Sequence, residues 1–215
     1  MNISSRNIRT PKTARYYLMG ELNQHAKTVW YVIHGFGQLA GEFIKQFQYL
    51  VNENTVVIAP EGLSRSYFGS KTGASWMTKE DRENEIKDYI EYLDNLHAEI
   101  LSKTGSELNV NILGFSQGVH TAARWFSLGK FQFQNLFLCS SDFPRDVDFT
   151  KLRDKLTGAK CYYMCGNEDE FITGDAYEGG KNLLKENNVI FEDFTFSGKH
   201  VVNHDIIKNI ISRNN

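Results

Sequence analysis

The chain has 215 residues and a formal net charge of −2, which suits one folded domain and gives no general attraction to nucleic acid or acidic membranes. Polar residues interrupt every apolar run well short of a bilayer-crossing length, and the first residues contain no apolar secretory segment. We therefore expect a single cytoplasmic domain over residues 1–215, with no nucleic-acid partner and no stable membrane association. The sequence leaves both a monomer and a homodimer open.

The three cysteines, Cys139, Cys161 and Cys165, all fall in apolar, strand-like segments. An odd number this small does not make a disulfide framework, and no nearby histidine or further cysteine completes a set of metal ligands. The sequence predicts small buried side chains in a reducing compartment and no metal site.

Strand-like and helix-like segments alternate along the chain. In chain order, the predicted strands are Arg15–Met19, Thr28–His34, Thr55–Ala59, Leu108–Leu113, Asn135–Ser140, Ala159–Cys165 and Ile190–Phe196. The predicted helices are Leu39–Leu50, Lys79–Lys103, Gln117–Leu128, Ala176–Glu186 and Asp205–Ser212. This alternation, with several continuous apolar strands, is typical of a mostly parallel sheet that carries helices on both faces.

The first chemical signal follows the strand Thr28–His34, which runs into His34-Gly35-Phe36-Gly37. Glycines let this loop pass close to another backbone segment, so that the N–H of Phe36 is a candidate donor to an oxyanion. His34 is expected to hold the loop through hydrogen bonds to the backbone rather than to transfer protons.

The segment between the third strand and the longest helix, Pro60 to Met77, has neither a helical nor a strand period and is predicted to be a loop. The helix Lys79–Lys103 then presents a stripe of apolar residues at helical spacing. Thr78 is predicted as its N-cap, with Asp81 as the reciprocal member of a capping box.

The strongest signal is Gly114-Phe115-Ser116-Gln117-Gly118, which lies between an apolar strand and a helix-like segment. Glycine-x-serine-x-glycine in this context is the nucleophile elbow, a tight strained turn that exposes a serine hydroxyl above a sheet. Ser116 is therefore the predicted nucleophile, and the N–H of Gln117 is the predicted second oxyanion donor.

In hydrolases whose serine lies on such an elbow, an acid and then a histidine follow the serine along the chain. His120 comes too early, so His200 and His204 are the candidates for the base, and we favour His200 because it lies in a loop after a strand. For the acid we favour Asp169 in Gly166-Asn167-Glu168-Asp169-Glu170, with Asp142 as the alternative.

These motifs, together with Gly198-Lys199-His200-Val201-Val202, resemble the phospholipase/carboxylesterase family, which includes acyl-protein thioesterases and small bacterial carboxylesterases. The resemblance extends from about Thr28 to Ile211. It implies an α/β-hydrolase fold without a separate cap domain, and a triad of Ser116, Asp169 and His200. It also implies oxyanion donors at Phe36 and Gln117, and it matches Trp76 to a tryptophan before the long helix. The chain departs from the family where Val119 and Lys199 replace glycines.

The sequence thus predicts a serine hydrolase that needs no cofactor and cleaves carboxylic esters through an acyl-enzyme intermediate. Short to medium acyl chains are expected, because without a cap the acyl site must be built from loops. The apolar residues available there are Phe36, Tyr67, Phe68, Trp76, Phe143, Phe171 and Val201. An acyl-protein thioesterase or lysophospholipase is one alternative, and a non-catalytic ligand-binding relative is another.

Overall fold

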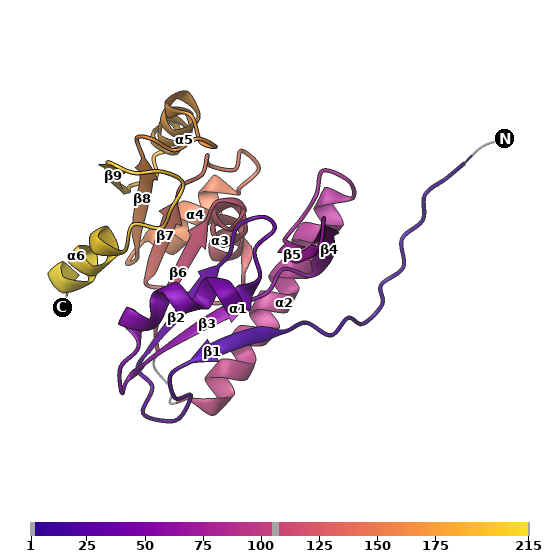
Figure 1. The fold of residues 1–215 in the computed structure, drawn as a ribbon, viewed down its shortest axis with the longest axis horizontal. Coiled ribbons are helices and arrows are strands. Elements are labelled where there is room, and N and C mark those ends of the chain that lie inside the picture. Colours follow the sequence, from indigo (N-terminus) through magenta and orange to yellow (C-terminus); the bar gives the residue numbers. More distant parts are fainter. Residues whose placement is uncertain (1–2, 105–107, 215) are drawn as a thin grey trace.

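A seven-stranded sheet forms the centre of the computed structural model, which describes residues 3–104 and 108–214 (Figure 1). The strands are β1 (Tyr16–Met19), β2 (Thr28–Ile33), β3 (Thr55–Pro60), β6 (Asn109–Phe115), β7 (Asn135–Cys139), β8 (Lys160–Gly166) and β9 (Glu192–Phe196). Their order across the sheet is β1-β3-β2-β6-β7-β8-β9. Strand β1 pairs antiparallel with β3, and the other neighbouring pairs are parallel.

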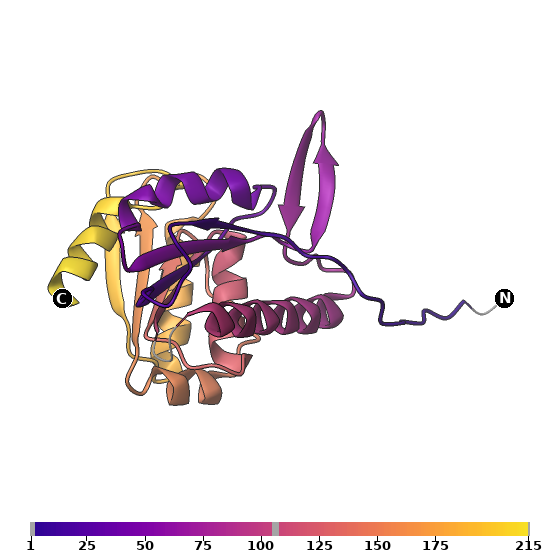
Figure 2. The ribbon, with the colours of Figure 1, turned by 90° about the horizontal axis from the view of Figure 1, so that it is seen from below.

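Helices cover both faces of this sheet, as Figure 2 shows edge-on. The helices are α1 (Ala40–Phe43) with the 3₁₀ segment η1 (Ile44–Leu50), α2 (Arg82–Lys103), α3 (Gln117–Leu128), α4 (Phe149–Leu156), α5 (Gly174–Glu186) and α6 (His204–Asn214). Buried residues of α2, α3, α4 and α5 share one apolar core, whereas α1, η1 and α6 share the other. Along β2, Tyr31 and Ile33 face the first core and Trp30 and Val32 face the second, as strand alternation requires. The predicted α/β-hydrolase architecture is confirmed.

The largest difference from the prediction is the segment after β3, which is not a plain loop. It contains an antiparallel hairpin, β4 (Ser64–Phe68) and β5 (Lys71–Ser75), that projects from the body of the molecule (Figure 2). The helix α4 was also not predicted. Among the described residues, the connections between strands are helices, loops and this hairpin, and none forms a separate cap domain.

The start of α2 also differs from the predicted capping box. The helix begins at Arg82, and Asp81 precedes it in the left-handed region at φ 47° without a side-chain cap. Thr78 instead donates from its backbone N–H and its hydroxyl to the Glu85 carboxylate, at 2.6 and 3.0 Å. Glu85 therefore ties the preceding segment to the first turn of the helix.

All three cysteines are buried and free. Burial raises the pKa of Cys161 and of Cys165 to about 12, so both thiols stay protonated. In the part of the chain that the structure describes, no helix is long and apolar enough to span a membrane.

A buried histidine on α2 makes stability depend on pH. His97 is packed against the rings of Tyr31, Phe131 and Phe133, and its Nδ1 lies 2.9 Å from the Tyr31 hydroxyl. Burial lowers the pKa of His97 from 6.5 to about 4, because the apolar surroundings disfavour its cation.

We predict that the free energy of unfolding falls as the pH drops from about 6.5 through about 4, since the unfolded chain binds a proton that folded His97 excludes. The shift corresponds to up to about 3 kcal/mol. Urea unfolding of His97→Phe between pH 7 and 4 should show a shallower pH dependence than the parent protein. Other buried histidines remain in both proteins, and replacement of the exposed His25 by Ala is the control. An unchanged slope in His97→Phe would contradict the prediction.

Candidate active site

Parallel strands bring the predicted site residues to one edge of the sheet. The loops after β2, β6, β7, β8 and β9 all begin at the carboxyl end of a parallel strand. They carry, in order, Phe36, Ser116, Asp142, Asp169 and His200. This edge is where open α/β sheets bind ligands.

The turn at Ser116 is strained in the way that the elbow motif predicts. Its backbone has φ 53° and ψ −123°, a combination that costs a non-glycine residue about 1–3 kcal/mol. A Cβ on Gly114 would lie 2.4 Å from the carbonyl oxygen of Gly118, and one on Gly118 would lie 2.1 Å from that of Ile33. Only glycine fits at both places. The turn sets the partly exposed Ser116 at the start of α3.

Asp169 and His200 are in direct contact. The Nδ1 of His200 lies 2.8 Å from Asp169 Oδ2 and 3.0 Å from Oδ1. The Asp169 side chain is 0% exposed and also accepts the backbone N–H groups of Phe171 and Ile172, each at 2.9 Å. The carboxylate favours the tautomer that carries a proton on Nδ1, so Nε2 is the ring nitrogen that can accept one.

The His200 ring lies next to the elbow. Its centroid is 4.8 Å from that of Phe115, the residue before Ser116, and 5.0 Å from that of Phe171. A Cβ on Gly35 would lie 3.0 Å from the Cβ of Ser116, so the β2 loop also passes beside the serine. The three predicted triad residues therefore lie in adjoining loops.

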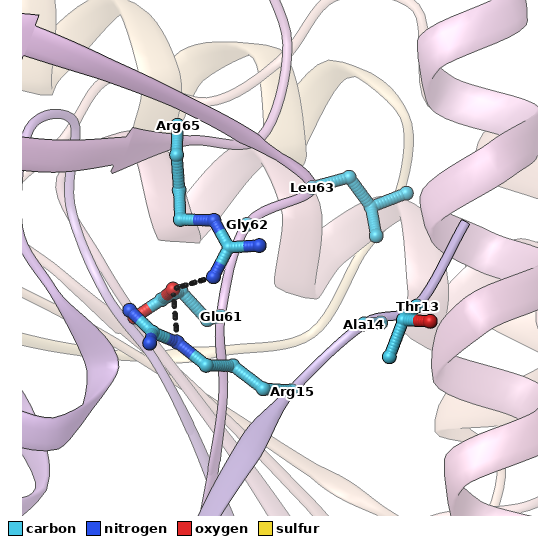
Figure 3. A pocket seen from close by; sticks show the side chains of 7 residues that line it. All are labelled: Thr13, Ala14, Arg15, Glu61, Gly62, Leu63 and Arg65. Atoms are coloured by element: carbon cyan, nitrogen blue, oxygen red, sulfur yellow. Dashed lines mark hydrogen bonds and ion pairs between the residues drawn. The ribbon is translucent and has the colours of Figure 1, made fainter.

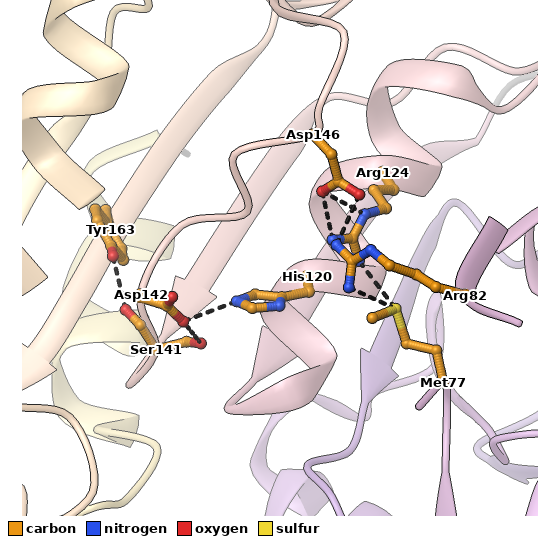
Figure 4. Close-up of polar contacts among 8 residues, drawn as sticks. All are labelled: Met77, Arg82, His120, Arg124, Ser141, Asp142, Asp146 and Tyr163. Atoms are coloured by element: carbon orange, nitrogen blue, oxygen red, sulfur yellow. Dashed lines mark hydrogen bonds and ion pairs between the residues drawn. The ribbon is translucent and has the colours of Figure 1, made fainter. Parts of the chain in front are cut away.

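The alternative residues have other partners. Asp142 pairs with His120, whose Nε2 lies 2.8 Å from Asp142 Oδ1, and this hydrogen bond holds the pKa of Asp142 below its ordinary value (Figure 4). His204 contacts the Tyr49 hydroxyl at 3.2 Å, and burial lowers the pKa of His204. Of the two candidate acids, Asp169 is the one that contacts His200.

The loop that carries Phe36 is tied down on both sides of that residue. The Gly35 N–H donates to the side-chain oxygen of Gln38 at 2.8 Å, and the Gly37 N–H donates to the Ala74 carbonyl at 2.8 Å. Gly37 has φ +73°, the left-handed region that favours glycine. The backbone of Phe36 is fixed by these neighbours.

His34 holds this loop through backbone contacts, as predicted. Its Nε2 accepts the N–H of Gly62 at 3.0 Å, and its Nδ1 donates to the Gly35 carbonyl at 2.8 Å. Burial lowers its pKa, which keeps the ring neutral in this bonding pattern.

Trp76, one of the apolar residues expected to form the acyl site and so to bind substrate, lies in the core instead. It is 1% exposed, its ring packs on His34 and Tyr89, and its indole N–H donates to the His34 carbonyl at 3.0 Å. Apolar side chains between strand and helix are buried by the hydrophobic effect, and this indole also satisfies its polar atom there. The observed contacts anchor the loop and do not support the predicted contact with substrate.

A buried glutamate that the sequence analysis did not single out fixes the base of the hairpin (Figure 3). Glu61 is 2% exposed, and its carboxylate accepts from Arg15 at 2.7 Å and contacts Arg65 at 3.5 Å. It also accepts the N–H of Ala40 at the start of α1, at 3.3 Å. One carboxylate thus joins the residue before β1, the hairpin and α1 beside the His34 loop.

A second unpredicted ionic cluster braces the other side of the site (Figure 4). Arg124 on α3 is 1% exposed and donates to Asp146 at 2.6 Å, and Asp146 also accepts from Arg82 at 2.7 Å. These two arginines hold the pKa of Asp146 below its ordinary value. The loop after β7 is thereby fixed to α2 and α3.

Apolar side chains surround the site residues at the surface. Phe36, Phe171 and Val201 are 57%, 72% and 48% exposed. Phe36 belongs to the predicted oxyanion loop, the backbone of Phe171 donates to Asp169, and Val201 follows His200 in the chain. Phe143 and Trp76 are buried, Tyr67 is 80% exposed on the projecting hairpin, and the side chain of Phe68 lies outside the described residues. Fewer of the predicted apolar residues are therefore exposed beside the site than the sequence suggested.

Over residues 3–104 and 108–214, no group of three or more His, Cys, Asp or Glu side chains has an arrangement that could hold a metal ion.

No protein-family model and no curated protein matches the sequence. Solved structures do match the fold. Maize (Zea mays) acyl-protein thioesterase 2 is 17% identical, with a TM-score of 0.66 over 94% of this chain and 99% of that one. A phospholipase/carboxylesterase from Dyadobacter fermentans is 15% identical, with a TM-score of 0.67 over 96% and 98%. Arabidopsis thaliana SOBER1 is 17% identical, with a TM-score of 0.67 over 87% and 97%.

At these identities the matches establish a shared fold, the α/β-hydrolase fold, across almost the entire length of each chain. The names of two of these structures agree with the family that the sequence motifs resemble.

We predict that His200→Ala loses ester hydrolysis by about 10⁴-fold, because members of one triad act as a unit. His204→Ala and His120→Ala, whose rings have other partners, should each stay within about tenfold of the parent, about three orders of magnitude short of a triad loss. Asp169→Asn should likewise lose far more activity than Asp142→Asn. Initial rates with an aryl ester measure all five variants. A larger loss in His120→Ala and Asp142→Asn than in His200→Ala and Asp169→Asn would contradict the prediction and assign catalysis to the His120–Asp142 pair.

Proposed function

We propose that the chain is a serine hydrolase that cleaves carboxylic esters of short to medium acyl chains. The observation that carries this proposal is the strained Ser116 elbow beside a His200 ring whose Nδ1 is bonded to the unexposed carboxylate of Asp169. A pure binding pocket does not need all three groups, which argues against a non-catalytic relative. The names of the matched structures, an acyl-protein thioesterase and a phospholipase/carboxylesterase, also support ester or thioester hydrolysis.

In the proposed reaction, Nε2 of His200 removes the hydroxyl proton as Ser116 Oγ attacks the carbonyl carbon of the substrate. The negative charge on the carbonyl oxygen is bound by the N–H groups of Phe36 and Gln117. Gln117 is the first residue of α3, so its N–H has no acceptor within the helix and lies at the positive end of the helix dipole.

Collapse of this intermediate breaks the bond to the leaving group, which takes the proton from His200 and departs as an alcohol or thiol. A water molecule then gives a proton to His200 as its oxygen attacks the acyl carbon. The bond from that carbon to Ser116 Oγ breaks, His200 returns the proton to Oγ, and the acid is released. Asp169 orients the imidazole and stabilises the imidazolium form of His200.

The leaving group and acyl chain are proposed from the surface around these atoms. Phe171, which packs on His200, and the neighbouring Val201 and Phe36 offer an apolar rim of limited size. Such a rim buries a few methylene groups, each contributing about 0.8 kcal/mol. A longer acyl site would instead favour the lysophospholipase or protein-thioesterase alternative.

We predict that Ser116→Ala lowers hydrolysis of a short aryl ester by about 10⁴-fold or more, as removal of a triad nucleophile does elsewhere. The variant should fold, because the elbow conformation does not require the hydroxyl. Steady-state rates, with the thermal midpoint as the folding control, test this. Retention of about a tenth of the parent rate in a folded variant would exclude Ser116 as the nucleophile.

We predict that kcat/KM for aryl esters rises by up to about fourfold per added methylene and then levels off at medium chain length. Phe171→Ala should reduce the gain with chain length. Ile190→Ala should not, because Ile190 is exposed and precedes β9, whereas His200 follows that strand. The series from acetyl to palmitoyl is measured below micelle-forming concentrations. A rise that continues to palmitoyl would contradict the short-chain proposal and favour a long acyl site.

A further inference from the structure

The side-chain amide of Gln117 is bonded at both ends to one short segment, Ser75 to Met77. Its oxygen accepts the N–H of Trp76 at 3.1 Å and contacts the hydroxyl of Ser75 at 3.3 Å. Its nitrogen donates to the carbonyl of Met77 at 2.9 Å. The first residue of α3 is thereby tied to a segment that lies about 40 positions earlier in the chain.

The residues just before that segment are bonded to the loop that carries Phe36. The Ala74 carbonyl accepts the N–H of Gly37 at 2.8 Å, and the Ala74 N–H donates to the carbonyl of Gln38 at 3.2 Å. The contact is so close that a Cβ on Gly73 would lie 2.3 Å from the Gly37 carbonyl oxygen. Residues 73–77, hereafter the bridge, therefore join the loop of one oxyanion donor to the side chain of the other.

We propose that the Gln117 side chain is a positioning residue that sets the spacing of the two oxyanion N–H groups through the bridge. This proposal rests on the serine hydrolase function proposed above. The two donors come from loops far apart in sequence, and each must lie about 2.7–3.1 Å from the position of the oxyanion. The amide acts through the bridge and does not itself touch the substrate.

The decisive variant is Gln117→Met, which keeps the length of the side chain and the backbone N–H of residue 117 but removes all hydrogen bonds to the bridge. Displacement of donors by about 1 Å costs up to about 10²-fold in rate. We expect kcat for an aryl ester to fall by about 30- to 100-fold with KM within about threefold. The affinity for an alkyl boronic acid, which forms a tetrahedral adduct on the serine, should fall in parallel with kcat/KM.

Two further variants separate positioning from general loosening of the loop. Ser75→Ala removes one partner of the Gln117 amide without a change at residue 117, and we expect a loss in kcat of about three- to tenfold. Thr78→Ala removes a hydroxyl bond to Glu85 from the same loop but outside the bridge, and its kcat should stay within about twofold.

A folded Gln117→Met with kcat and boronic-acid affinity within twofold of the parent overturns the proposal. So does a variant in which only KM changes. Should Gln117→Met not fold, Ser75→Ala decides, and a loss below twofold at an unchanged thermal midpoint overturns the proposal. Ser116→Ala, measured alongside, distinguishes this failure from failure of the proposed function. Retention of about a tenth of the parent rate or more in folded Ser116→Ala refutes the proposed serine mechanism, whereas a loss of about 10⁴-fold leaves the positioning test valid.

Discussion

The backbone conformation of Ser116 is the constraint on which the site depends. A residue with a side chain at φ 53° persists only where its surroundings hold it, and here they do so from several sides. The Ser116 N–H donates to the Cys139 carbonyl on the neighbouring strand at 3.0 Å, while β6 and α3 fix the chain before and after it. The close contacts at Gly114 and Gly118 leave no room for relaxation. The sheet therefore supplies the rigidity that holds the partly exposed Ser116 in this strained conformation.

The same sheet decides which histidine meets which acid. Three histidines near this edge have distinct partners: His200 contacts Asp169, His120 contacts Asp142, and His204 contacts Tyr49. The Asp169–His200 pair differs in that its carboxylate is unexposed and also accepts two backbone N–H groups, which fix its orientation. A carboxylate held in this way orients an imidazole, which is the role of the acid in a triad. The Asp142 side chain is 53% exposed.

Much of this arrangement is predictable from the sequence, because apolar runs and glycine spacing have direct physical causes. The helix Gln117–Leu128 matches α3 residue for residue, and the elbow follows from Gly114 and Gly118. The hairpin β4–β5 was missed because it projects from the body, and Ser64, Arg65 and Ser66 give no apolar alternation. The choice between Asp142 and Asp169 depends on which loops meet, and Glu61 and Arg124 are buried charges whose partners come from distant segments. Sequence spacing does not reveal such pairings.

The central claim is that Ser116 is a nucleophile activated by His200, and covalent labelling tests it most directly. A fluorophosphonate reacts with an activated serine and not with ordinary surface hydroxyls. After reaction with the intact protein, peptide mass spectrometry should find a single stoichiometric adduct on Ser116, and His200→Ala should abolish it while folding is retained. Absence of an adduct in the folded parent protein, or an adduct on Ser116 that forms equally fast in His200→Ala, would contradict the claim.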